Sequence, residues 1–185
     1  AASDVYKRQV YNKSFGYHTY KKLNKLENNH VFDLSSITKI LATMPLVIQE
    51  YESGNLSLNT RLDQLFPKKK LADKGEITLK EMLSHYARLR PWIPFYEETL
   101  NRREKPKTRF YKTNSRSSFT TPVTENLFLK RNYEEKIFKS IVDSELIENL
   151  EFKYSDLPFY FLKFWFEDIY SKPPVSYTHL RAHET

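Results

Sequence analysis

A long apolar stretch with helical spacing constrains the fold of this chain more than any other feature. Apolar and aromatic residues recur at intervals of three and four, at Ile37, Ile40, Leu41, Met44, Val47, Ile48 and Tyr51. This spacing predicts a helix, and its opposite side is also largely apolar, with Ala42 and Leu46. We therefore expect a helix that is buried at the centre of a domain. Ser35 or Ser36 is placed to begin the helix, and Gly54 to end it.

The patterns along the rest of the chain predict mainly further helices. Residues 10–20 suit a strand or hairpin, with Gly16 near its turn. Three more helices are expected, at residues 77–89, 132–144 and 157–170. Thr78 is a possible cap for the first of them. Residues 102–124 are basic and rich in Ser and Thr without a clear period, which predicts a loop or an insertion.

The two ends of the chain resemble translated sequencing adapters, as found at the ends of some metagenomic open reading frames. These segments are residues 1–9 and 175–185, and we exclude them from fold reasoning as one would exclude a tag. Residues 10–174 then form one partial domain.

Composition removes several classes of function. The chain has no cysteine, so disulfides, thiolate metal sites and a cysteine nucleophile are excluded. Its formal charge of +7 is compatible with nucleic-acid binding, but the basic residues are scattered among acids, which favours a solvated lysine-rich exterior. No stretch approaches the roughly 18 apolar residues of a membrane span. His18 and His30 stand isolated in the sequence, and we expect no metal or cofactor.

One Ser-x-x-Lys pair could carry chemistry, namely Ser36 and Lys39. Residues three apart on a helix share a face, and the helix N-terminus favours negative charge that develops at the hydroxyl. Burial would lower the pKa of the lysine, and its neutral amine could then take the serine proton. On spacing alone, an N-capping serine and a lysine that reaches solvent explain the pair better.

The surrounding sequence strengthens the catalytic interpretation. Residues 32–40 (FDLSSITKI) resemble the first motif of the serine β-lactamase-related and penicillin-binding-protein-like family, which includes class C β-lactamases, D-Ala-D-Ala carboxypeptidases and esterases. Residues 52–59 and 77–85 resemble the turn and helix that follow. The resemblance covers nearly all of residues 10–170. It implies the α/β (α+β) β-lactamase/transpeptidase-like fold, truncated here, helix-dominated and with a small N-terminal antiparallel β element.

A second motif of the family is matched at residues 154–156 (Tyr-Ser-Asp), where the family has Tyr-x-Asn and Asp is a known variant. The resemblance implies Ser36 as nucleophile, Lys39 as its partner, Tyr154 as general acid/base and Asp156 as a supporting residue that binds Lys39. A carboxylate at this position also favours protonated Lys39, which shifts the base role to Tyr154. The resemblance makes His85 a structural histidine rather than a member of a Ser-His triad.

The third family motif, Lys/His-x-Gly on an edge strand, is missing from the chain. That strand supplies the second oxyanion N–H, so we expect the chain by itself to be inactive or nearly so. Ala87-Arg88 also replaces the Ser-Gly of many relatives, and residues 84–96 look most like a branch from Bacteroidetes-type bacteria. In that branch a family 3 glycoside hydrolase domain precedes this one, which implies a periplasmic or extracellular protein.

Two functions remain open at this point. The first is acyl transfer through an acyl-enzyme at Ser36, with a β-lactam, a D-Ala-D-Ala peptide or an ester as substrate. The second is a non-catalytic module that binds peptidoglycan fragments and is attached to a cell-wall glycoside hydrolase.

Overall fold

The structure, a computed structural model, describes residues 2–3 and 9–171. The chain forms two compact units, the first ending at Ile37 and the second beginning at Thr38. In the first unit, strand β1 (Ala2–Ser3) pairs antiparallel with β2 (Gln9–Tyr11). This pair is a small antiparallel β element, and β1 lies within residues 1–9, the segment that resembles an adapter.

A short turn structure follows β2 in the first unit. Gly16 has a left-handed φ of 86°, as its expected place near a turn requires. Tyr17 and Lys25 form a single antiparallel bridge, and the Leu26 N–H donates to the Gly16 carbonyl at 3.0 Å. Of the strand or hairpin predicted over residues 10–20, only residues 10 and 11 lie in a strand, and Tyr17 adds a single bridge.

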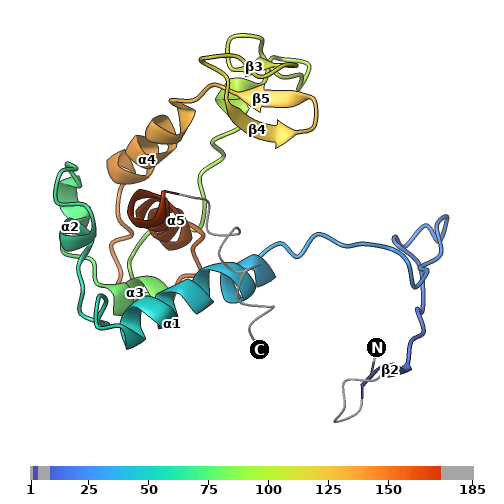
Figure 1. Cartoon of the computed structure of the whole chain (residues 1–185), viewed down its shortest axis with the longest axis horizontal. Helices are drawn as coiled ribbons and strands as arrows, with labels where there is room; N and C mark the ends of the chain where they lie inside the picture. Colours follow the sequence, from blue (N-terminus) through green and yellow to red (C-terminus); the bar gives the residue numbers. More distant parts are fainter. Residues whose placement is uncertain (1, 4–8, 172–185) are drawn as a thin grey trace. The chain divides into compact units, whose positions relative to one another are not determined.

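Helices build the core of the second unit. Within the described residues they are α1 (Met44–Glu52), α2 (Leu62–Leu65), α3 (Leu79–Leu83), α4 (Tyr133–Asp143) and α5 (Leu157–Tyr170). Figure 1 shows α5 among the other helices, and it contacts α3, α4 and the turn before α1. Leu157, Phe161, Leu162 and Phe166 of α5 are completely buried. Burying such a side chain stabilises the fold by about 1.5–3 kcal/mol, so α5 is the centre of this unit.

Only one side of α1 is buried. Leu46, Val47 and Glu50 are buried, whereas Ile48 and Tyr51 are exposed. On the buried side the Tyr170 hydroxyl of α5 donates to the Glu50 carboxylate. The expectation of a centrally buried helix is therefore wrong for this structure. Apolar residues all round a helix are buried only where another element packs on them, and α5 packs on one side.

The turn before α1 is a π-helix, η1 (Lys39–Thr43). The Met44 N–H donates to the Lys39 carbonyl, five residues back, in place of the usual four. Pro45 lies in the first turn of α1 and has no N–H, so the carbonyl of Leu41 lacks its ordinary helical donor. The regular helix predicted from spacing is thus interrupted. Pro45 indicates this interruption in the sequence, but a prediction from apolar spacing does not take it into account.

The other predicted helices are confirmed, with one difference in length. The helices expected at residues 132–144 and 157–170 are α4 and α5, within one residue at each end. Thr78 caps α3: its Oγ1 accepts the Glu81 N–H at 3.3 Å, and the Glu81 carboxylate accepts the Thr78 N–H at 2.8 Å. However, α3 ends at Leu83 and not near residue 89, because His85 adopts a left-handed φ of 62°.

A small antiparallel sheet lies between α3 and α4 in the sequence. Its strands are β3 (Tyr111–Lys112), β4 (Thr121–Thr124) and β5 (Leu127–Leu129), in the order β3–β5–β4. Residues 102–124, which were predicted to be a loop or an insertion, are therefore not a loop where β3 and β4 form. Both strands are stabilised by pairing with β5, and such cross-strand pairing leaves no periodic signal in strands this short.

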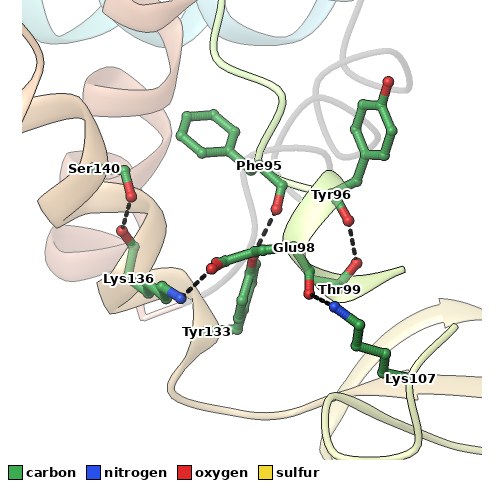
Figure 2. Close-up of polar contacts among 8 residues, drawn as sticks. All are labelled: Phe95, Tyr96, Glu98, Thr99, Lys107, Tyr133, Lys136 and Ser140. Atoms are coloured by element: carbon green, nitrogen blue, oxygen red, sulfur yellow. Dashed lines mark hydrogen bonds and ion pairs between the residues drawn. The ribbon is translucent and has the colours of Figure 1, made fainter. Parts of the chain in front are cut away.

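A cluster of polar side chains connects the segment before this sheet, from Phe95 to Lys107, to α4 (Figure 2). The Tyr133 hydroxyl lies 2.5 Å from the Phe95 carbonyl oxygen and 2.6 Å from the Glu98 carboxylate, and Lys136 pairs with the same carboxylate. Lys107 Nζ donates to the backbone carbonyl of Glu98 at 2.7 Å. Hydrogen bonds from Lys136 and Tyr133 hold the pKa of Glu98 below its ordinary value. Burial and the neighbouring Glu98 carboxylate raise the pKa of Tyr133.

Candidate active site

Lys39 lies at the start of the π-helix, and its side chain is only 16% exposed. Its Nζ is 2.6 Å from Asp156 Oδ1, at the start of α5. The same ammonium lies 5.3 Å from the centre of the Tyr154 ring and 5.5 Å from that of Phe159. The cation is therefore held between one carboxylate and two aromatic rings, which are favourable neighbours for an ammonium group.

These contacts decide the charge of Lys39. Burial by itself would lower the pKa of Lys39, but hydrogen bonds to Asp156 and Tyr154 outweigh it, and the pKa lies above its ordinary value. The expectation that burial would produce a neutral amine is therefore wrong. The Asp156 carboxylate compensates the ammonium, so Lys39 is a fixed cation at neutral pH.

The segment that carries Tyr154 and Asp156 is fixed by its backbone and by Ser155. The Ser155 Oγ accepts the Leu157 N–H at 3.2 Å and donates to the Arg90 carbonyl at 2.6 Å. Ser155 thereby satisfies a free N–H of the first turn of α5. Asp156 is the N-cap residue but makes no side-chain capping bond. Its carboxylate therefore pairs with Lys39 and not with the helix.

His85 contacts the same segment from the end of α3. Its ring centre lies 4.5 Å from that of Tyr154, and its Nδ1 is 3.2 Å from the Ser155 N–H nitrogen. Its backbone carbonyl accepts the Lys153 N–H at 2.9 Å. Burial lowers the pKa of His85 and the Lys39 cation lowers it further, whereas Asp156 acts in the opposite direction. The sequence marked His85 as structural, and the structure adds that it contacts the Tyr154 segment.

Arg88 has a left-handed φ of 57°. A left-handed conformation costs a residue with a side chain about 1–2 kcal/mol. Two hydrogen bonds with Ile147 offset this cost: the Ile147 N–H donates to the Arg88 carbonyl at 2.7 Å, and Arg88 Nε donates to the Ile147 carbonyl at 2.6 Å. These hydrogen bonds hold Arg88 in the backbone turn that leads from His85 to Arg90.

Ser36 lies in a turn directly before the helical residues 37–38, with an exposed side chain. Asp33 Oδ1 accepts the Ser35 N–H at 2.8 Å, and the Ile37 N–H donates to the Leu34 carbonyl at 2.9 Å. Ser35 has a left-handed φ of 45°. These bonds place Ser36 at the N-terminal end of the helix, as the sequence predicts.

The predicted residues thus fall into two groups. Lys39, Tyr154 and Asp156 belong to the second unit, and the structure brings them together from the π-helix and the start of α5. Ser36 belongs to the end of the first unit. The contribution of His85 is visible only in the structure, because residues 85 and 154 are far apart in the chain.

Two other expectations concern histidines and metals. His18 and His30 are not isolated: their Nε2 and Nδ1 atoms lie 2.8 Å apart, since the turn structure of the first unit brings them together. In the part of the chain that the structure describes, no group of three or more His, Asp or Glu side chains is arranged to hold a metal ion. None of the helices in that part is both long and apolar enough to cross a membrane. The two remaining histidines, His179 and His183, are four residues apart in the sequence, a spacing that could mimic a helical metal pair, and they lie outside the described residues.

Comparison with known proteins identifies one related family. A family model described as Beta-lactamase matches residues 1–118, which is more than half of the chain. The matched range contains Ser36, Lys39 and His85 and ends before Tyr154. No curated protein matches the chain.

Proposed function

Because the chain belongs to the Beta-lactamase family, we propose that it is the nucleophile-bearing part of a serine hydrolase that forms an acyl-enzyme at Ser36. The observation that carries this proposal is the cluster of Lys39, Asp156 and Tyr154, with the Lys39–Asp156 ion pair at 2.6 Å. A fixed ammonium beside a phenol stabilises the phenolate, and a phenolate can take the proton of a serine hydroxyl.

In the proposed reaction, Ser36 Oγ attacks the carbonyl carbon of an amide or ester while its proton passes to the Tyr154 phenolate. The tetrahedral intermediate then expels the amine or alcohol, which takes that proton from Tyr154. Water attacks the acyl-enzyme by the reverse sequence and releases the acid. Lys39 stays protonated throughout, and Asp156 keeps it in place. The substrate class is a β-lactam, a D-Ala-D-Ala peptide or a simple ester.

The oxyanion that forms on the substrate needs two N–H donors in this chemistry. The backbone N–H of Ser36 is the first. None of the three glycines, Gly16, Gly54 and Gly75, is preceded by Lys or His two residues earlier, so the sequence contains no Lys/His-x-Gly to supply the second. Loss of one donor costs about 10²–10³ in rate. We therefore expect turnover by this chain alone to be very slow or absent.

The finer features of the proposal rest on sequence resemblance. We assign the chain to the class C type of β-lactamase-like domains, with the transpeptidase-like fold and a third motif supplied by a longer form of the protein. Residues 84–96 support a place next to a family 3 glycoside hydrolase domain. A protein with both domains acts on cell-wall material, and its place is the periplasm or the cell exterior.

A reactive probe tests the nucleophile without requiring turnover. A fluorophosphonate is more reactive than an ester substrate, so we expect slow stoichiometric labelling of Ser36, seen by intact mass and peptide mapping. Ser36→Ala should abolish the label, whereas the matched variant Ser35→Ala should retain it. Tyr154→Phe and Lys39→Met should label at least about 10²-fold more slowly, because the first removes the base and the second removes the cation that stabilises its phenolate. Equal labelling of wild type and Ser36→Ala would exclude this function.

The absent Lys/His-x-Gly element favours a second candidate function, a non-catalytic module that binds peptidoglycan fragments. This candidate predicts no Ser36 label in any form of the protein. It also predicts calorimetric binding of muropeptides that Ser36→Ala leaves unchanged.

A further inference from the structure

His85 holds the segment that carries Tyr154 through three separate contacts. Its backbone carbonyl accepts the N–H of Lys153, the residue before Tyr154, at 2.9 Å. Its Nδ1 accepts the N–H of Ser155, the residue after Tyr154, at 3.2 Å. Its ring lies against the Tyr154 ring, with the centres 4.5 Å apart. Two of these contacts come from the side chain, so they depend on which residue stands at position 85.

The Ser155 contact requires one state of the imidazole ring. A backbone N–H can only donate, so Nδ1 must be unprotonated and the ring must be neutral, with its proton on Nε2. The ionisable side chains around His85 are Lys39 from the π-helix, Asp156 from the start of α5, and Tyr154 itself. The other rings packed against it, Phe152 and Phe159, carry no charge. Burial and the Lys39 cation therefore favour the neutral ring that this contact needs.

From this geometry we infer that His85 is a positioning residue for Tyr154: its neutral ring fixes the phenol beside Lys39, and protonation of His85 releases it. This inference rests on the proposed acyl-transfer function. His85 Nδ1 takes no proton from the substrate, since it accepts the Ser155 N–H. Its effect on reaction rate comes from the orientation of Tyr154 alone.

Two substitutions of similar shape, both without the ring, test the hydrogen bond that Nδ1 accepts. His85→Asn places an amide oxygen where Nδ1 stands, cannot titrate, and tolerates the left-handed φ of 62°. His85→Leu has the shape of Asn but no acceptor. We expect His85→Asn to retain most of the wild-type rate of Ser36 labelling by fluorophosphonate at neutral pH, and His85→Leu to lose about tenfold or more. Wild type should lose labelling as the pH falls through the pKa of His85, while His85→Asn should lack this acidic limb.

Nuclear magnetic resonance gives a readout that does not depend on reactivity. In the wild type, the amide proton of Ser155 and the ring protons of Tyr154, assigned with Tyr154→Phe, should titrate together with the His85 ring. In His85→Asn, neither the Ser155 signal nor the Tyr154 signals should show a titration with the midpoint of the wild-type His85 ring. If the Ser155 and Tyr154 signals do not follow His85, or if His85→Asn keeps the acidic limb, the positioning role is excluded. If no variant labels Ser36 but these signals follow His85, the proposed enzyme function fails and the contact stands. If His85→Leu does not fold, the wild-type and His85→Asn titrations decide the matter.

Discussion

Single residues determine which group of the Lys39 cluster can accept a proton. Lys39 is 2.6 Å from a carboxylate, and its pKa is raised, so an ammonium at this place is a poor base. Tyr154 lies against that ammonium and is the remaining candidate in the cluster. Asp156 therefore acts indirectly: by holding Lys39 charged, it assigns Lys39 to electrostatic stabilisation and leaves proton transfer to Tyr154.

The first prediction at this scale concerns Asp156→Asn. The raised pKa of Lys39 means that the ion pair contributes stability fully below the unfolded-state pKa of about 10.4 and loses it as the pH rises through the folded-state value. Asp156 is 42% exposed, so solvent screening limits the contribution to about 1 kcal/mol or less. Denaturant unfolding should therefore show a wild-type advantage over Asp156→Asn near neutral pH that shrinks above about pH 10.5.

Asp168→Asn is the matched control for this measurement, because Asp168 is exposed on the same helix. It should leave the alkaline profile of wild type unchanged. An advantage over Asp156→Asn that stays constant up to about pH 12 would indicate an effect of the Asp156 charge on the N-terminus of α5 and not an interaction with Lys39.

At the scale of elements, local sequence predicts helices well and their interruptions poorly. The bounds of α4 and α5 follow from apolar periodicity because each buries one continuous face. The early end of α3 and the π-helix before α1 come from single residues, His85 with its left-handed φ and Pro45 without its N–H. The family resemblance also implied that Asp156 binds Lys39, but nothing in the local sequence around either residue indicates this contact, which depends on packing between the π-helix and α5.

The second prediction concerns the cap of α3, which leads directly to His85. Thr78→Ala removes the acceptor of the Glu81 N–H and the donor to the Glu81 carboxylate. We expect a loss of about 1 kcal/mol in the free energy of unfolding. Glu81→Gln keeps a side-chain oxygen for the Thr78 N–H, so it should cost only a few tenths of a kcal/mol. Equal losses in the two variants would show that the Thr78 hydroxyl is not the stabilising group.

At the scale of the whole molecule, buried polar contacts connect α4 to the rest of the second unit. Lys74 is completely buried, and its Nζ donates to the carbonyls of Val142 and Ser144, at the end of α4, and to Asp73. Lys74→Met keeps the volume but leaves both carbonyls without a donor. We expect a loss of about 2–3 kcal/mol in the free energy of unfolding. The exposed neighbour Lys70, changed to Met, should stay within about 0.5 kcal/mol of wild type.

The polar cluster in Figure 2 connects the other end of α4, and its stability should depend on acid pH. Lys136 and Tyr133 lower the pKa of Glu98, so the folded state binds its proton less readily than the unfolded state does. The stabilisation is therefore present above the ordinary glutamate pKa of about 4.3 and disappears as the pH falls through the lowered value. Because the Glu98 side chain is 42% exposed, we expect about 1 kcal/mol or less.

Glu98→Gln tests this dependence in urea unfolding between about pH 2 and pH 7. Wild type should be more stable than the variant near pH 7, and the two curves should converge as the pH falls below about 4, since protonated Glu98 and the amide of the variant are then both uncharged. Glu97→Gln is the matched control, because Glu97 is exposed and is not among the residues of the cluster (Figure 2). A wild-type advantage that persists unchanged at about pH 2 would mean that the cluster stabilises α4 through the shape of Glu98 and not through its charge.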